Sequence, residues 1–183
     1  MTLSETLNAV VPLDEKETED LRVMREFAAS LAEPFSRKQW PAHFTGSAVV
    51  VTLDGARVCL LHHAKLNRWL QPGGHADSAD GGDMAQTALR EAREETGLEV
   101  ELVSQTPLDV DVHVIPARKD EPEHRHLDVR YLVIAKNPEA LAHDPNESHG
   151  AQWLTWEEAL ARADEAPLKR MLSKANSLSH GAR

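Results

Sequence analysis

Two short apolar runs joined by an Asp-Gly pair constrain the fold of this chain most. Residues 45–53 read TGSAVVVTL, residues 56–62 read ARVCLLH, and the intervening Asp54-Gly55 favours a tight hairpin turn. Short runs rich in valine and leucine are typical of buried strands. Further strands are predicted at 100–103, 108–115, 127–135 and 152–155. We therefore expect a fold organised around a β-sheet.

Helix signals flank and separate these strands. The predicted helices are an N-terminal helix from the Asp14–Glu17 capping box to Pro34, a central helix from Asp83 to Gly97, a helix that begins at the Thr155–Glu158 capping box, and a last short helix from Pro167. The order of elements does not follow a regular βαβ alternation. It is typical of an α/β (α+β) fold, in which helices pack on a mixed sheet.

Charge and composition limit the partners of this chain. The 183 residues carry a formal net charge of −10 and no dense Lys/Arg run, so we expect no binding to duplex nucleic acid. There is no run of about eighteen apolar residues and no secretory signal, so we expect no membrane association. Cys59, the one cysteine, fits a reducing cytoplasm, and its apolar strand predicts a core thiol.

The central helix carries an unusual set of carboxylates. Glu91, Glu94 and Glu95 are related as i, i+3 and i+4, so they share one helical face beside an apolar stripe of small residues. One interpretation is a solvated face with Arg–Glu pairs. The alternative is an oxygen-ligand site for Mg²⁺ or Mn²⁺, because three carboxylates on one face suit such an ion. A polar loop just before the helix, residues 75–82, favours the second interpretation.

The segment REAREETGL at 90–98, preceded by Gly73-Gly74 and a polar loop, resembles the Nudix box of the Nudix hydrolases. The matching positions of its second half are Arg90, Glu91, Ala92, Glu94, Glu95, Gly97 and Leu98. The first half departs from the pattern: the spacing is two residues longer, and Gly82 stands where the family has Glu. Asp80 or Asp83 is a candidate for the displaced carboxylate.

The resemblance covers about residues 43–165 and favours a bacterial subgroup with a PGGHxD loop and a lengthened box. It implies a Nudix-type α/β/α sandwich with a central mixed β-sheet and an additional N-terminal helix. We accordingly predict an N-terminal helical extension at 1–40 and a Nudix hydrolase domain at 41–183, forming one compact unit.

What the resemblance implies about function is a metal-dependent pyrophosphohydrolase. It would cleave a diphosphate linkage in a nucleoside diphosphate derivative or a related small organic pyrophosphate, with Mg²⁺ or else Mn²⁺ as cofactor. The implied metal ligands are Glu91, Glu94, Glu95 and the Gly73 carbonyl; the implied catalytic residues are Glu91, Glu94, Arg90 and Glu147. Arg90 would hold a carboxylate, and Glu91, or else Glu147, would deprotonate water. A homodimer is one candidate assembly.

Histidines and aspartates alternate along two of the predicted strands. If the strands form a hairpin, these six side chains share a face: Asp109, Asp111, His113, His124, His126 and Asp128. The alternatives are structural pairing, contacts to substrate phosphate, and a second metal site. The predicted substrate-binding residues are Gly74, His75, Asp77, Trp69, His113, His126 and Asp128. Base stacking competes with a core role for Trp69, Trp153 and Trp156.

Two other functions remain open from the sequence. One is a nucleotide-binding sensor without turnover, which the altered loop suggests and the full glutamate set opposes. The other is a diphosphate isomerase resembling isopentenyl diphosphate isomerase, which the histidines suggest. Cys59 is poorly placed for the active-site cysteine that those isomerases use.

Overall fold

A mixed β-sheet forms the centre of the computed structural model, which describes residues 1–118 and 120–181. The strands are β1 (Ala42–Val51), β2 (Arg57–His63), β3 (Arg68–Leu70), β4 (Gly73–His75), β5 (Val100–Leu102), β6 (Asp109–Ile115), β7 (His124–Ala135) and β8 (Ser148–Thr155). The main path runs β3-β2-β1-β7-β5, while β4 pairs with β1, β6 with β7, and β8 with β2. β1 and β7 pair in parallel, and the other pairs named here are antiparallel.

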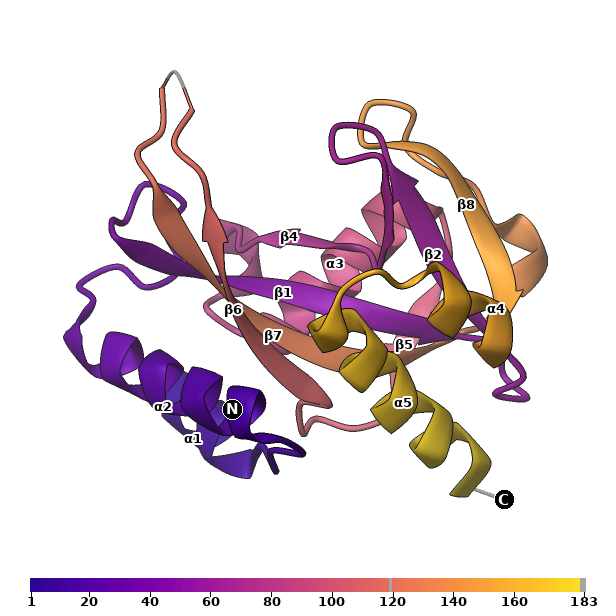
Figure 1. Ribbon diagram of the computed structural model, residues 1–183, viewed down its shortest axis with the longest axis horizontal. Coiled ribbons are helices and arrows are strands. Elements are labelled where there is room, and N and C mark those ends of the chain that lie inside the picture. The colour runs from indigo at the N-terminus through magenta and orange to yellow at the C-terminus, as the bar shows by residue number, and fades with distance from the viewer. Residues whose placement is uncertain (119, 182–183) are drawn as a thin grey trace.

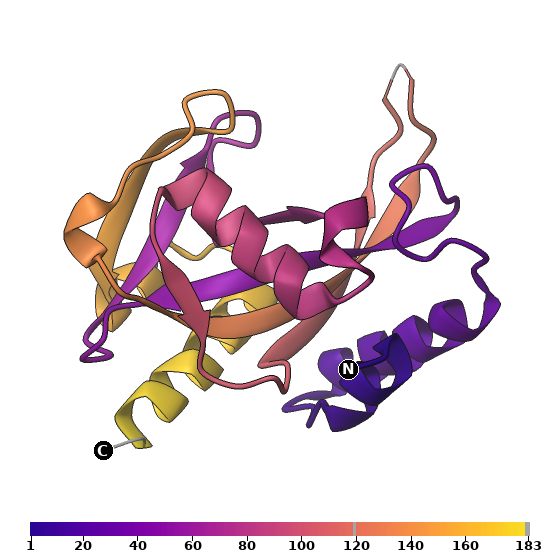
Figure 2. The ribbon, with the colours of Figure 1, turned by 180° about the vertical axis from the view of Figure 1, so that it is seen from behind.

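The helices lie on both faces of this sheet. They are α1 (Leu3–Ala9), α2 (Glu15–Ser30), α3 (Met84–Thr96), α4 (Trp156–Arg162) and α5 (Ala166–Gly181), with short 3₁₀ turns η1 (Ser78–Asp80) and η2 (Pro138–Ala140). α4 and α5 lie in front of the sheet in Figure 1, and α3 crosses its other face in Figure 2. This arrangement confirms the predicted α/β/α sandwich.

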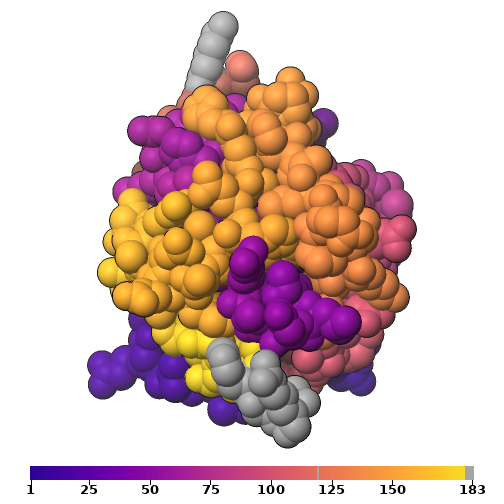
Figure 3. Space-filling model, turned by 90° about the vertical axis from the view of Figure 1, so that its right-hand side faces the viewer, coloured from indigo at the N-terminus to yellow at the C-terminus, as the bar shows by residue number. Residues whose placement is uncertain are grey.

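The alternating side chains of β1 explain the layers. Phe44, Ala48 and Val50 point into a core shared with α3 and the N-terminal helices. Val49 and Val51 join a second core, which α4 and α5 cover. In Figure 3 the β1–β2 turn lies against residues of the last third of the chain. There the indole of Trp156 donates a hydrogen bond to the Gly55 carbonyl over 2.9 Å, as expected of a core tryptophan.

A glycine in β1 lets α3 approach the sheet closely. A Cβ at Gly46 would lie 2.9 Å from the Thr87 Cβ and 3.0 Å from the Ala88 amide nitrogen. Real Cβ atoms do not tolerate such contacts with a helix backbone, so a larger residue would push the helix outward. Gly46 of β1 therefore determines how closely α3, and any side chain that α3 carries, approaches the sheet.

Several element boundaries differ from the sequence-based expectations. The first strand begins at Ala42 rather than at Thr45, because its first residues pair in parallel with β7. β3 and β4 were not predicted, since three-residue strands carry no periodic signal. α1 was also missed, although Thr2 and Glu5 form a capping box at its start.

The N-terminal helices pack on the same core as the rest of the chain. Leu7 of α1 and Leu21 and Met24 of α2 are almost fully buried in the core that contains Phe44. α2 begins at the Asp14 cap, as predicted. Among the described residues, no helix is long and apolar enough to cross a membrane.

Candidate active site

The acidic helix α3 is built as its sequence predicts. Asp83 caps it by accepting a hydrogen bond from the Ala85 amide over 3.0 Å, and Gly97 ends it with a left-handed φ of 66°. The stripe that packs on the sheet is buried and consists of Ala85, Ala88, Leu89 and Ala92. The three glutamates therefore lie on the flank of the helix, beside the sheet.

Arg90 joins the helix to the preceding loop. Its guanidinium donates to the Asp80 carboxylate over 2.9 and 3.0 Å, to Glu91 Oε1 over 2.9 Å and to Glu94 Oε2 over 3.0 Å. It also donates to the His75 carbonyl over 2.7 Å. Of the two candidates for the displaced carboxylate, Asp80 is thus the one that contacts Arg90, because Asp83 caps the helix.

The lengthened loop is an ordered structure held by Asp80. This carboxylate is 7% exposed and accepts hydrogen bonds from the Asp77 amide over 2.8 Å and the Thr87 hydroxyl over 3.0 Å. Asp77 in turn caps the turn η1 and is held there. Gly82, with φ of 76°, lies against the ring of Phe35, which a Cβ at this glycine would approach to 2.8 Å. The end of the loop at Gly82 is therefore in contact with the N-terminal segment.

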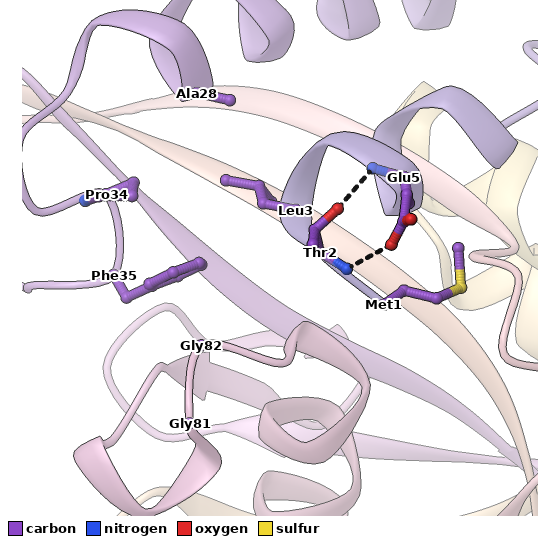
Figure 4. Close-up of a pocket in the computed structure, with 9 residues that line it drawn as sticks. All are labelled: Met1, Thr2, Leu3, Glu5, Ala28, Pro34, Phe35, Gly81 and Gly82. Atoms are coloured by element: carbon purple, nitrogen blue, oxygen red, sulfur yellow. Dashed lines mark hydrogen bonds between the residues drawn. The ribbon is translucent and has the colours of Figure 1, made fainter.

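A surface hollow marks this junction. Figure 4 shows Phe35 and Leu3 on one side and Gly81 and Gly82 on the other. Its lining residues are Met1, Thr2, Leu3, Glu5, Ala28, Pro34, Phe35, Gly81 and Gly82. Since the predicted metal ligands Glu91, Glu94 and Glu95 are absent from this lining, the hollow is separate from the candidate active site.

The carboxylate of Glu91 lies against the glycine turn. A Cβ at Gly74 would lie 2.6 Å from Glu91 Oε1, so the glycine leaves space that this carboxylate occupies. The side chain of Glu91 is 13% exposed. Burial raises the pKa of Glu91 although the Arg90 hydrogen bond acts in the opposite direction.

Of the three glutamates on α3, Glu95 is the one whose negative charge is least offset by its surroundings. Burial and the nearby charges of Glu91 and Glu147 raise its pKa to about 8, and the hydrogen bond from the Gly73 backbone offsets only part of this. Glu94, by contrast, has a side chain that is 58% exposed. The carboxylate cluster, defined as Glu91, Glu95 and Glu147, thus gathers negative charge at the Gly73-Gly74 turn.

Glu147 reaches this cluster from the other end of the sequence. It is exposed in the loop before β8, and its carbonyl accepts a hydrogen bond from the Ala64 amide over 2.9 Å. Its charge contributes to the raised pKa of Glu95. The structure therefore brings together α3, the glycine turn and the late loop. Their catalytic and metal-binding roles stay predictions.

The histidine–aspartate hairpin forms as expected. β6 and β7 pair so that Asp109 lies opposite Arg130, Asp111 opposite Asp128, and His113 opposite His126. The aspartates are buried and bound within the protein. Arg130, 5% exposed, contacts Asp109 over 3.1 Å, Asp111 over 3.2 Å and Asp128 over 2.8 Å.

Arg130 and the three aspartates, here called the paired charge network, have the arrangement expected if these residues serve structural pairing. Asp128 also accepts hydrogen bonds from the Thr45 hydroxyl over 3.0 Å and the Ser47 hydroxyl over 2.8 Å. His113 contacts Asp111 over 3.0 Å. Both His113 and Asp128 thus have partners within the protein. The substrate contacts predicted for them remain predictions.

Histidine rings gather beyond the aspartates, at the end of the sheet. The ring centroids of His43, His75 and His126 lie 4.8–5.0 Å apart. His113 and His124 lie 5.4 and 5.2 Å from His126. Burial, with smaller contributions from neighbouring rings, lowers the pKa of His75 to about 4 and that of His126 to about 2. His43 was not singled out from the sequence. Its position two residues before Thr45, in phase with Ser47, is the signal that would have found it.

The remaining candidate residues lie apart from the carboxylate cluster or in the core. Trp69 stacks on His62 at 5.1 Å, and the Arg162 guanidinium lies 4.5 Å from its ring centroid. Trp153 is partly buried and donates to the Pro138 carbonyl over 2.8 Å. Cys59 is fully buried, which confirms the predicted core thiol, and burial raises its pKa to about 12.

Fold and site agree with one protein family. The family model of the NUDIX domain matches residues 43–175, nearly three quarters of the chain, so this chain belongs to the NUDIX family. α1 and α2 lie outside the match. The resemblance stated from the REAREETGL segment is thereby confirmed.

Individual relatives are more distant. The m7GpppN-mRNA hydrolase NUDT17 of Xenopus laevis is 32% identical over 125 residues, which is 61% of this chain and 41% of that protein. The chain thus spans less than half the length of this curated relative. The similarity to it lies within a domain-sized segment.

Solved structures show the same fold. The binary complex of C. elegans Ap4A hydrolase has a TM-score of 0.60 at 22% identity, over 75% of this chain and 98% of that one. The NUDIX domain of Shewanella oneidensis NrtR, complexed with ADP ribose, has a TM-score of 0.58 at 18% identity, over 84% and 97%. A NUDIX-family hydrolase from Clostridium perfringens has a TM-score of 0.55 at 25% identity, over 74% and 97%.

Proposed function

We propose that this chain is a Mg²⁺-dependent pyrophosphohydrolase that cleaves a phosphoric anhydride bond in a nucleotide. The observation that carries the proposal is the carboxylate cluster at the Gly73-Gly74 turn. Within it, Glu95 is partly buried beside Glu91, and among the described residues its charged neighbours raise its pKa rather than lower it. Such a concentration of like charge is unfavourable unless a ligand compensates it.

The donor set fits a hard divalent cation. Carboxylate oxygens from Glu91, Glu94 and Glu95, with the Gly73 carbonyl, are the ligand types that Mg²⁺ and Mn²⁺ prefer. The space that Gly74 leaves is occupied by the Glu91 carboxylate and would be closed by any side chain. When bound, such an ion neutralises phosphate oxygens and acidifies a water molecule.

The residues of the chain have separate roles in this proposal. Arg90 is a positioning residue, because its guanidinium holds both Glu91 and Glu94 while Asp80 anchors it. Glu91 accepts the proton of the attacking water, and Glu147 is the second candidate for this base. A base with a raised pKa suits proton transfer near neutral pH, as burial provides for Glu91.

The substrate class follows from the chemistry and from the relatives. Proteins with this fold include, by name, an Ap4A hydrolase and a domain complexed with ADP ribose, and the curated relative is named as an mRNA cap hydrolase. We propose a small nucleotide with a diphosphate linkage as the partner, rather than duplex nucleic acid or a membrane. Gly74, His75, Asp77, Trp69, His113, His126 and Asp128 remain the proposed substrate contacts.

The organisation of the protein is part of the proposal. Residues 1–40 form a helical extension and residues 41–183 the catalytic domain, in a cytoplasmic protein with a homodimer as one candidate state. The packing of Phe35 on Gly82 supports a role for the extension in holding the lengthened loop. Light scattering of the purified protein measures the assembly directly.

The test is hydrolysis of a panel of dinucleotides, capped nucleotides and nucleotide sugars with Mg²⁺ or Mn²⁺. The Glu95→Gln and Glu94→Gln variants are expected to lose about 10²–10⁴-fold in kcat/KM, as when a positioned proton-transfer or charge-stabilising group is removed. Glu99→Gln, at an exposed glutamate outside the cluster, is the matched control. Full activity in Glu95→Gln would contradict the site assignment.

The same assay separates the two alternatives. A sensor would bind a nucleotide tightly without releasing product. A diphosphate isomerase would interconvert isomers without hydrolysis, but its active-site thiol has no counterpart at Cys59, which is fully buried within β2. The structure therefore gives the isomerase alternative no support.

A further inference from the structure

Three histidines from three neighbouring strands converge at one end of the sheet. His43 on β1 lies beside His126 on β7 in the parallel pairing, and His75 on β4 pairs opposite Thr45, two residues along β1. One ring nitrogen from each histidine lies within 4.8 Å of one from each of the others. Because paired strands hold these positions, the arrangement does not depend on a loose surface loop.

His43 directs an unpartnered ring nitrogen into the triad. Its side chain is 1% exposed, and its Nδ1 lies 3.3 Å from the Gln39 carbonyl oxygen. This contact places the ring proton on Nδ1, so Nε2 carries a lone pair. His43 Nε2 is buried and has no hydrogen-bond partner among the described residues. An unpartnered buried acceptor is unfavourable, so a ligand that accepts its lone pair is favoured.

The tautomer of His43 is the one that metal-binding histidines use. Such residues commonly donate the distal N–H to a backbone carbonyl, which orients the ring and directs the other nitrogen to the ion. We propose that His43, His75 and His126 form a second metal site, separate from the glutamates, that binds Zn²⁺ or a similar transition-metal ion through three imidazole nitrogens.

The ligand set selects the class of ion. Three neutral nitrogens suit Zn²⁺ and its neighbours and do not suit Mg²⁺, which prefers oxygen. The aspartates of the same hairpin are not free to change this, because Asp111 and Asp128 are bound by Arg130. Three protein ligands leave a fourth tetrahedral position for water or a substrate oxygen. His75 and His126 are only partly buried, which leaves a route to that position.

The proposed metal site is physically linked to the carboxylate cluster. The His75 carbonyl accepts a hydrogen bond from Arg90 Nη2 over 2.7 Å, while its ring belongs to the triad. Gly73 and Gly74, which contact the glutamates, precede it in the same strand. The second ion would therefore lie beside the hydrolytic centre without sharing its ligands.

The experiment measures metal binding and not activity. Chelator-treated protein is titrated with Zn²⁺ by calorimetry, and with Co²⁺ by its visible d–d absorption, for wild type and for the variants His126→Ala and His75→Ala. We expect one ion per chain in wild type and at least ~100-fold weaker binding in either variant. Circular dichroism checks that each variant is folded. Heteronuclear NMR of the imidazole nitrogens should show a shift of His43 Nε2 on addition of Zn²⁺.

Matched controls distinguish the two sites. His113→Ala removes a ring that lies 5.4 Å from His126 but outside the triad, and Glu95→Gln alters the carboxylate cluster; both are expected to keep the zinc. The proposal is overturned if wild type binds no ion, if binding persists in His126→Ala, or if Glu95→Gln abolishes it. These outcomes do not depend on whether the chain hydrolyses a nucleotide.

Discussion

Two groups of carboxylates in this protein are held in opposite ways. In the paired charge network, Arg130 contacts Asp109, Asp111 and Asp128. In the carboxylate cluster, Glu95 has Glu91 and Glu147 as its charged neighbours. The aspartates lie in strands, Glu91 and Glu95 lie in a helix, and Glu147 lies in the loop before β8. They differ in how cations are supplied: Arg130 contacts all three aspartates, whereas in the cluster the ion pair found among the described residues is that of Arg90 with Glu91, which does not include Glu95.

The pKa values record this difference. Burial alone would raise the pKa of Asp111, but the His113 hydrogen bond and the charges of Arg130 and Lys16 hold it far below its usual value. For Glu95, burial and like charges act together and raise the pKa to about 8. A buried carboxylate whose pKa the protein lowers is part of the structure. One whose pKa is left raised is a candidate for binding something else.

Removal of Arg130 should have the largest effect on stability. Arg130→Met leaves three buried aspartates without their shared partner, so we expect the free energy of unfolding to fall by about 3–5 kcal/mol, measured by urea denaturation. Arg22→Ala is the control, because its pairs with Glu19 and Glu26 are exposed. If Arg130→Met and Arg22→Ala were equally stable, Arg130 would not be the residue that stabilises the buried aspartates.

Addition of Mg²⁺ should stabilise the protein through the carboxylate cluster. At an ion concentration about 100-fold above the dissociation constant, linkage predicts a gain of about 2.7 kcal/mol in the free energy of unfolding. Thermal melts with and without Mg²⁺ measure the gain. It should be lost in Glu95→Gln and kept in Glu99→Gln. A gain that survives in Glu95→Gln would place the ion elsewhere.

The pH dependence of stability should have opposite signs for the two groups. Without metal, the folded protein keeps the Glu95 proton up to about pH 8, whereas the unfolded chain releases it near the ordinary glutamate pKa of 4.5. Stability therefore falls between these pH values, by on the order of 1–3 kcal/mol. Glu95→Gln should remove this fall, as measured by urea denaturation in a chelator.

Asp111 gives the stability of the protein the opposite dependence on pH. Its folded pKa lies below the ordinary aspartate pKa of 3.8, so its stabilising contribution is present above that pH and is lost as the pH falls further. Glu95→Gln should leave this loss of stability at low pH unchanged. If the variant altered stability at low pH as well as at higher pH, the two groups would be coupled rather than independent.

Loss of Lys16 should have the smallest effect. Lys16 Nζ lies 2.8 Å from Asp111 Oδ1, but its side chain is 44% exposed and Arg130 still holds Asp111. Lys16→Met is expected to cost about 0.2–1 kcal/mol by urea denaturation. Lys65→Met, at another exposed lysine, is the control. A loss as large as that of Arg130→Met would mean that the α2 contact, rather than Arg130, stabilises the network.

The sequence predicted those parts of the site that depend on local spacing. The caps and acidic face of α3 follow from i, i+3 and i+4 relations, and the β6–β7 register follows from strict alternation. The parallel pairing of β1 with β7 joins residues about 80 positions apart, and no local pattern encodes it. For this reason His43 was missed, and Arg130 was not recognised as the shared partner of three aspartates.

The three-residue strand β4 has a consequence for how this protein can change. Gly73 faces Ser47 so closely that a Cβ would collide with it, Gly74 faces Glu91, and the His75 ring faces His43 and His126. Every position of β4 is thus constrained by a different neighbour. Selection for a new nucleotide in the laboratory should accept substitutions in the turn at 64–67 well before any in β4. A chain that does change there would have to rebuild both proposed ion-binding regions at once.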